Sequence, residues 1–164
     1  MKLVTSPNPI LTQVATDWDF QVDGNGAELE KEMIEFMINK NGIGLAANQI
    51  GLLKRVFAIK LKNQEPLAMF NPTVVSSSDS DESAEEGCLS FPDLWLQVKR
   101  PSSIVSEYFD KDGNKCTITL SGLDCRCFLH ELDHLNGVVF TDKVSQLKLA
   151  MAIKKQNKIR KRNG

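Results

Sequence analysis

Both histidines of the chain lie in one short stretch, CFLHELDHLNG, at residues 127–137. His130 and His134 are four residues apart, and Glu131 directly follows the first. On a helix, side chains four residues apart lie about 40° apart around the axis, so two imidazoles can converge on one ion. The pattern H-E-x-x-H binds a metal through both imidazoles and leaves the glutamate free as a general base. The stretch therefore predicts a catalytic metal site, which still needs a third protein ligand.

Two residues compete for the place of third ligand. No other histidine exists, and Asp142 is the carboxylate that remains downstream. Upstream, Cys88 lies in EGCLSFP, directly after a glycine that allows close backbone approach. A thiolate is a strong ligand for a borderline-soft divalent metal. The residue types favour Cys88 with His130 and His134, and they leave the set with Asp142 open.

The remaining cysteines are weaker candidates for this site. Cys125 and Cys127 are two residues apart on the predicted helix, which puts them about 200° apart around its axis. They cannot both face one ion, but Cys127 lies on the side of His130 and could line the site. In a chain without a secretion signal, the four cysteines are expected to be free thiols or metal ligands.

Helices are predicted before, at and after the histidines. Apolar residues at helical spacing predict one helix over 28–39, stopped by Asn41-Gly42. Residues 121–124 resemble a capping box that opens the histidine helix, and Gly137 suits its C-terminal cap. A last helix is expected after Ser145.

Short strands are predicted around these helices. Apolar and β-branched runs predict strands over 55–61 and 66–72, and a strand, turn and strand over 103–120. The polar stretch SSSDSDESAEEG, residues 76–87, is expected to be a loop. The expected fold class is α+β, with short antiparallel strands packed around a central metal-binding helix and a C-terminal helix. At 164 residues, one domain spanning 1–164 is expected.

Composition and charge narrow the partners. The chain has 41% hydrophobic and 25% charged residues, as soluble globular proteins do. It has no apolar run near 18 residues and no signal peptide, so a cytoplasmic location without a membrane partner is expected. Residues 1–142 carry 12 Lys and Arg against 21 Asp and Glu, whereas residues 143–164 carry 8 and none. This basic segment predicts an anionic partner, with a solvated helix face as the alternative.

Three separated motifs resemble those of the peptide deformylase family, whose members remove the formyl group from N-terminal formylmethionine of new polypeptides. They occur in the family's order, and the resemblance runs through most of residues 1–145. The first pattern, G-x-G-x-A-A-x-Q, is matched by Gly42, Gly44, Ala46, Ala47 and Gln49. The second, E-G-C-L-S, is matched by Glu86 to Ser90, and the third, H-E-x-D-H, by His130 to His134.

The resemblance implies a role for each site residue. Cys88, His130 and His134 would hold one divalent metal ion, Fe²⁺ in the family's usual form, with Zn²⁺, Ni²⁺ or Co²⁺ as alternatives. Glu131 would accept a proton from the attacking water and deliver it to the departing amine. The donors for the oxyanion of the tetrahedral intermediate would be the Gln49 side-chain amide and the Leu89 backbone N–H.

The same resemblance implies a substrate, formylmethionyl peptides, which would pair along the backbone of Ile43 and Gly44 as an added strand. The methionine side chain would enter an apolar pocket lined by Leu123, Cys127 and Ile43. The C-terminal helix, 145–164, would contact ribosomal RNA through a basic set: Lys154, Lys155, Lys158, Arg160, Lys161 and Arg162.

Some residues fit the family less closely. Leu129 stands where many members have glutamine, and Trp95 lies in a region that often holds arginine. Asp133 is expected to be a charge partner near the site or a solvent-facing residue. Arg126 has no assigned role and is expected to reach solvent.

Two other functions remain open from the residues themselves. A metalloprotease that cuts internal peptide bonds would use Asp142 as a ligand and act on unformylated peptides. A structural metal site or ribosome-binding module without turnover would need a fourth ligand, and no convincing one is found.

Overall fold

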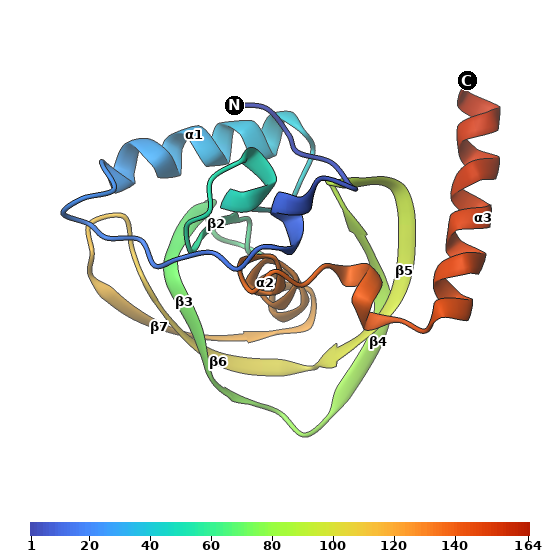
Figure 1. Ribbon diagram of the computed structural model, residues 1–164. Coiled ribbons are helices and arrows are strands. Elements are labelled where there is room, and N and C mark those ends of the chain that lie inside the picture. Colours follow the sequence, from blue (N-terminus) through green and yellow to red (C-terminus); the bar gives the residue numbers. More distant parts are fainter.

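The computed structural model describes residues 1–164 and contains two antiparallel sheets around one central helix (Figure 1). The helices are α1 (Gly26–Asn39), α2 (Gly122–Leu135) and α3 (Gln146–Asn163), with 3-10 turns at Pro9–Thr12, Ala47–Ile50 and Phe140–Lys143. The strands are β1 (Gly44–Ala46), β2 (Val56–Ile59), β3 (Leu67–Ser77), β4 (Asp81–Cys88), β5 (Phe91–Pro101), β6 (Ser103–Phe109) and β7 (Lys115–Ser121). The α+β prediction is confirmed.

The strands form a five-stranded sheet and a separate hairpin. The sheet has the order β1-β2-β3-β6-β7, and β4 pairs with β5. All pairings are antiparallel. In Figure 1, α2 is seen end-on in the middle, with the sheet on one side and the hairpin on another. The first strand, β1, is an edge strand, so its outer side is free to pair.

The sheet separates two apolar clusters, because successive side chains of a strand point to opposite faces. Phe57 of β2 packs with α2, where its ring meets that of Phe128 edge-on at 5.2 Å between centroids. Val56, its neighbour, packs with Met33 and Met37 of α1. All four residues of β2 are buried. The sheet is therefore held between α1 and α2, which fixes the position of the histidine helix.

The predicted helices are present, with one difference in detail. Gly137, at φ +72°, follows the end of α2 as expected of a C-terminal cap. Ser121 is the N-cap of α2, but its side chain makes no capping hydrogen bond. The Asp124 carboxylate instead accepts a hydrogen bond from the Lys62 backbone N–H, at 3.0 Å. The predicted capping box is therefore wrong.

The loop predicted over residues 76–87 is also wrong. β3 continues to Ser77 and β4 begins at Asp81, so only the connection between them is a turn. Four of the eight residues of β4 are exposed, three are half-buried and Glu86 is buried. Their polar composition therefore reflects solvent contact, while the backbone pairs regularly with β5. The polar composition of residues 76–87 indicates exposure to solvent, but it does not indicate the backbone conformation.

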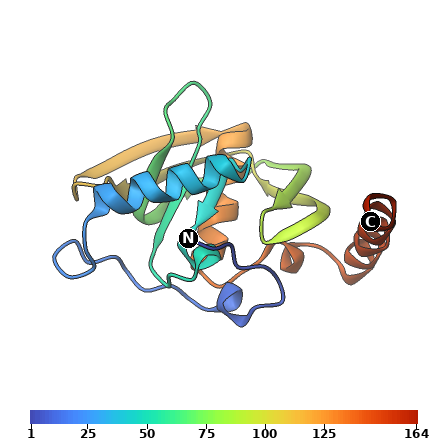
Figure 2. The same ribbon diagram turned by 90° about the horizontal axis from the view of Figure 1, so that it is seen from above.

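The last helix, α3, begins after Ser145 as expected and has no buried residue. Figure 2 shows it beside the rest of the molecule, against the hairpin end. Its half-buried residues Leu149 and Ala152 pack on a small apolar cluster of β5. None of the helices combines the length and apolar content required to cross a bilayer.

Candidate metal centre

Three metal-ligating side chains converge between the hairpin and α2. Cys88 ends β4, and His130 and His134 lie one turn apart on α2. Their ligand atoms all lie within 4.8 Å of one another, and Cys88 Sγ is 3.3 Å from His134 Nε2. Asp142 lies outside this group, and its carboxylate accepts a hydrogen bond from the Val139 N–H. The structure thus brings together the favoured ligand set.

The two imidazoles have opposite electrostatic environments. Burial, reinforced by the neighbouring His130, lowers the pKa of His134 well below its ordinary value. Burial also acts to lower the pKa of His130, but hydrogen bonds with Cys88 and Glu86 outweigh it and raise that pKa to about 10. The two imidazoles differ because His130 has the Glu86 carboxylate as a hydrogen-bond partner, whereas the Nδ1 of His134 has no partner.

Glu86 fixes the orientation of His130. The His130 Nδ1–H donates to Glu86 Oε2 at 2.9 Å, which leaves Nε2 as the free ring nitrogen. Arg100 Nη2 and Arg126 Nη1 donate to the same carboxylate at 3.0 and 2.9 Å. Burial alone would raise the pKa of Glu86, but bonds from His130 and Arg100 lower it to about 2. A carboxylate behind a ligating histidine is a common support of metal sites.

The two arginines were not identified as site residues from the sequence. Arg126 does not reach solvent, since it is 7% exposed and donates to the carbonyls of Val98 and Glu82 at 2.7 and 2.8 Å. Arg100 also pairs with Asp133 at 2.9 Å, which makes Asp133 a charge partner. The sequence carries a signal for Arg100, because this residue continues the alternation of buried positions Leu94, Leu96 and Val98 along β5.

Glu131 faces the cavity from the same turn of α2. Its carboxylate is buried, and Oε2 has no hydrogen-bond partner. Burial raises its pKa to about 7. The edge strand β1 passes so close that a Cβ on Gly44 would lie 2.8 Å from the Glu131 Cδ. Glycine at position 44 is therefore what lets β1 lie against the carboxylate.

Two predicted donors flank the cysteine. Gln49 is 1% exposed; its Oε1 accepts from the Ala46 N–H at 2.9 Å, and its Nε2 donates to Ser90 Oγ at 3.0 Å and to Cys88 Sγ at 3.6 Å. The side-chain amide is thus held beside the ligand set. The Leu89 backbone N–H donates no hydrogen bond within the chain, and Leu89 lines the cavity.

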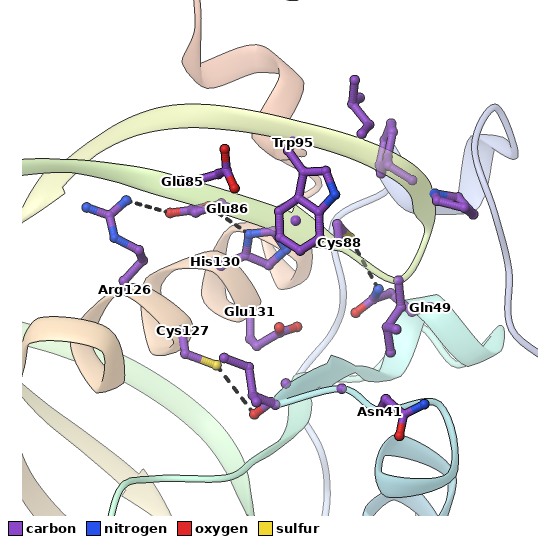
Figure 3. A pocket seen from close by; sticks show the side chains of 18 of the residues that line it. Asn41, Gln49, Glu85, Glu86, Cys88, Trp95, Arg126, Cys127, His130 and Glu131 are labelled. Carbon is purple, nitrogen blue, oxygen red and sulfur yellow. Dashed lines mark hydrogen bonds and ion pairs between the residues drawn. The ribbon is translucent and has the colours of Figure 1, made fainter. Parts of the chain in front are cut away.

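A cavity of about 610 Å³ opens in front of these groups. Figure 3 shows Glu131, His130 and Cys127 on its α2 side, with Cys88 and Trp95 on the hairpin side. Ile43, Gly44 and Leu123 also line it. The Ile43 carbonyl accepts from the Lys60 N–H at 2.8 Å and from Cys127 Sγ at 3.4 Å. In an antiparallel pair, successive residues alternate between bonding to the partner strand and facing away from it. Because the Ile43 carbonyl bonds to Lys60, the N–H and carbonyl of Gly44 face the free edge of β1.

Comparison with known proteins gives consistent matches over nearly the whole chain. The sequence profile of the family described as polypeptide deformylase matches residues 1–150. The peptide deformylase of Rhizobium meliloti (strain 1021) is 41% identical over 166 residues, which cover 99% of this chain and 95% of that protein. That of Brucella suis biovar 1 (strain 1330) is 42% identical over 161 residues, which cover 96% and 91%.

Solved structures agree with the sequence matches. A peptide deformylase from Legionella pneumophila has a TM-score of 0.88 and 34% identity, with 99% of this chain and 96% of that chain covered. A peptide deformylase from Synechococcus elongatus, in complex with actinonin, has the same TM-score and identity, with 95% and 87% covered.

Proposed function

The chain belongs to the polypeptide deformylase family, and on that premise we propose that Cys88, His130 and His134 hold the metal ion beside which Glu131 moves the proton. The enzyme is a metal-dependent hydrolase that removes the formyl group from N-terminal formylmethionine and releases formate. The observation that carries the assignment is the convergence of one thiol and two imidazoles on a cavity that Glu131 also faces.

The donor set fits a divalent ion. One sulfur and two imidazole nitrogens would hold the ion with three protein ligands, the number typical of catalytic sites that also bind water. When bound, the ion supplies the Lewis acidity that makes water a nucleophile near neutral pH. Fe²⁺ is our assignment, after the family resemblance; Zn²⁺, Ni²⁺ and Co²⁺ suit the same ligand types.

Glu131 is the proposed proton carrier. Its carboxylate would take the proton of the attacking water and deliver it to the amine nitrogen, which must leave protonated. Burial and the absence of a partner for Oε2 support this role, because that oxygen is available to a proton. A pKa of about 7 suits a group that must both accept and release a proton near neutrality.

Gln49 and Leu89 are the proposed donors to the oxyanion. The Gln49 amide is fixed by Ala46 and Ser90, and its second N–H contacts Cys88 Sγ at 3.6 Å, beside the ligand set, before substrate arrives. The unused Leu89 N–H adds a second fixed dipole. Donors oriented in advance stabilise developing charge without reorganisation, and each is worth about 2.7 to 4 kcal/mol of barrier.

The substrate would lie along the edge of β1. Gly44 offers its N–H and carbonyl toward the cavity, and the peptide would pair there as an added strand. The Ile43 side chain, Leu123 and Cys127 line the part of the cavity beside Glu131 that would take the methionine side chain. Since formylated chains emerge where translation takes place, the enzyme would act in that compartment, the cytoplasm.

The basic face of α3 is the proposed contact with ribosomal RNA. Five of its cationic residues are exposed and paired with no acid: Lys154, Lys155, Lys158, Lys161 and Arg162. Arg160 differs, because it donates to the Pro92 carbonyl at 3.2 Å and lies 3.8 Å from Asp93. Arg160 therefore contributes to holding the helix in place.

A comparison of blocked peptides tests the reaction. The metal-loaded enzyme should release formate from formyl-Met-Ala-Ser and leave acetyl-Met-Ala-Ser and an amidated internal peptide intact. Cleavage of the internal peptide without formate release would favour the metalloprotease. A folded, metal-loaded chain without any turnover would favour a structural or binding role.

A further inference from the structure

The outer part of the cavity is lined by two exposed side chains of the hairpin, Glu85 of β4 and Trp95 of β5. Trp95 lies directly opposite Gly87 in the ladder, and Glu85 lies two residues before that glycine. Side chains two apart on a strand, and those opposite each other, share one face. Figure 3 shows the indole over His130 and Cys88, with Glu85 farther along the hairpin, and both residues line the cavity.

Trp95 offers a free aromatic surface. It is 54% exposed, and its six-membered ring lies against Gly87, where an added Cβ would come within 2.6 Å of Cζ3. No aromatic ring or cation of the chain stacks on it. Gly87 thus lets the indole lie flat on the backbone, with its outer surface available to a ligand.

Glu85 is the cavity's unpaired rim acid. It takes part in no ion pair of the chain. Two other carboxylates that line the cavity are paired, Glu86 with two arginines and Asp93 with Arg160 at 3.8 Å, and Glu131 is buried beside the ligand set. Arg126 is the one Lys or Arg that lines the cavity, and its guanidinium already donates hydrogen bonds to Glu86 and to backbone carbonyls.

A path for the peptide follows from the two ends of the cavity. The formyl group must reach the ligand set, and the methionine side chain fills the apolar part beside Leu123 and Cys127. The chain then leaves between Gly44 and the hairpin. An extended peptide rises about 3.3 Å per residue, so the next two residues pass the rim formed by Trp95 and Glu85.

We propose that Trp95 and Glu85 form a specificity subsite for a Lys or Arg side chain in one of the two residues after the formylated methionine. An aromatic face attracts a cation through its quadrupole, and an unpaired carboxylate attracts it by charge. This inference rests on the proposed function, because it assigns the substrate preference of that same site.

The test measures kcat/KM for formate release by the metal-loaded full chain. Substrates are formyl-Met-Ala-Ser and its forms with Lys or Glu at the second or third residue. Each contact is worth about two- to fivefold in favour of Lys over Glu. Glu85→Gln and Trp95→Leu should each reduce the Lys-to-Glu ratio by that factor, and Trp95→Phe should retain part of it.

The matched control is Glu82→Gln, since Glu82 is an exposed acid of the same strand that points to the other face. It should leave the ratio unchanged. Because the ratio compares two substrates of one preparation, partial unfolding or metal loss cancels. A wild-type ratio near one, or a ratio that survives both rim substitutions, overturns the inference. Failure to release formate even from formyl-Met-Ala-Ser would instead overturn the proposed function.

Discussion

Glu131 and His130 are sequence neighbours with different tasks, because one step along a helix turns the side chain by about 100°. The His130 ring is turned toward Cys88 and held by Glu86, whereas the Glu131 carboxylate faces the cavity with one oxygen unpartnered. In the proposed mechanism, His130 ligates the metal ion and Glu131 stays free to carry a proton. The division of roles follows from position on α2 and not from residue chemistry alone.

Substitution of Cys88 tests the ligand set directly. Cys88→Ser should weaken metal binding by at least about tenfold, because a thiolate is replaced by a hydroxyl that stays protonated. Anaerobic titration with Co²⁺ measures the affinity, and the sulfur-to-cobalt absorption band reports thiolate ligation.

Cys125→Ser is the control for this measurement. Cys125 is buried on α2, and its thiol contacts the Pro101 carbonyl at 3.4 Å, outside the ligand group. The folded fraction of the Cys125→Ser variant should bind Co²⁺ with the affinity of the wild type. Equal loss of affinity in both variants would count against Cys88 as a ligand.

At the scale of elements, the site depends on the close approach of β1 to α2. Gly44→Ala would place a methyl group against the Glu131 carboxylate, which must then move. Displacement of a catalytic group by about 1 Å costs on the order of 10²-fold in rate. We expect kcat to fall by about that factor while the metal content is unchanged. An unchanged kcat would mean that Glu131 is not held where the reaction needs it.

The buried charges behind His130 connect the hairpin to α2. Arg100→Met leaves Glu86 without one of its two arginines in a site where both side chains are 4% exposed. Loss of one partner of a buried pair costs about 3–5 kcal/mol in the free energy of unfolding. Thermal unfolding should therefore begin about 10 °C lower.

Lys99→Met, at the adjacent position, provides the comparison. The Lys99 side chain is 73% exposed and lies 3.9 Å from Asp81, so its loss should change the free energy of unfolding by less than about 0.5 kcal/mol. If both variants unfolded alike, the network around Glu86 would have no special part in stability.

At the scale of the whole molecule, charge is separated: the catalytic part is acidic and α3 is basic. Changing Lys154, Lys155 and Lys158 to Gln should weaken binding to ribosomes, and wild-type binding should fall tenfold or more between about 50 and 200 mM salt. Cosedimentation measures both effects. The control variant changes three exposed lysines outside α3 to Gln: Lys2, Lys31 and Lys40. It removes the same amount of positive charge and should have little effect on ribosome binding. Equal loss in both triple variants would contradict a specific role for α3.

The sequence was sufficient to predict features that depend on residues close together in the chain. Spacing on one helix was sufficient to place His130, His134 and Glu131 relative to each other. Cys88 was favoured by residue type and the family motif, but its approach to the histidines depends on how the hairpin packs on α2. The role of Arg126 could not be predicted either, because its partners lie on β4 and β5. The polar strand β4 was missed because seven of its eight residues are exposed or half-buried, so its sequence lacks an apolar alternation.

The most direct test of the account compares the wild type with Glu131→Ala. Both are purified without oxygen, loaded with Fe²⁺ and assayed for formate release from formyl-Met-Ala-Ser, with bound metal measured per chain. The account predicts equal metal content and a rate about 10² to 10⁴ times lower in the variant, because only the proton carrier is removed. Equal rates, or stoichiometric loss of metal from the variant, would contradict the assignment of Glu131.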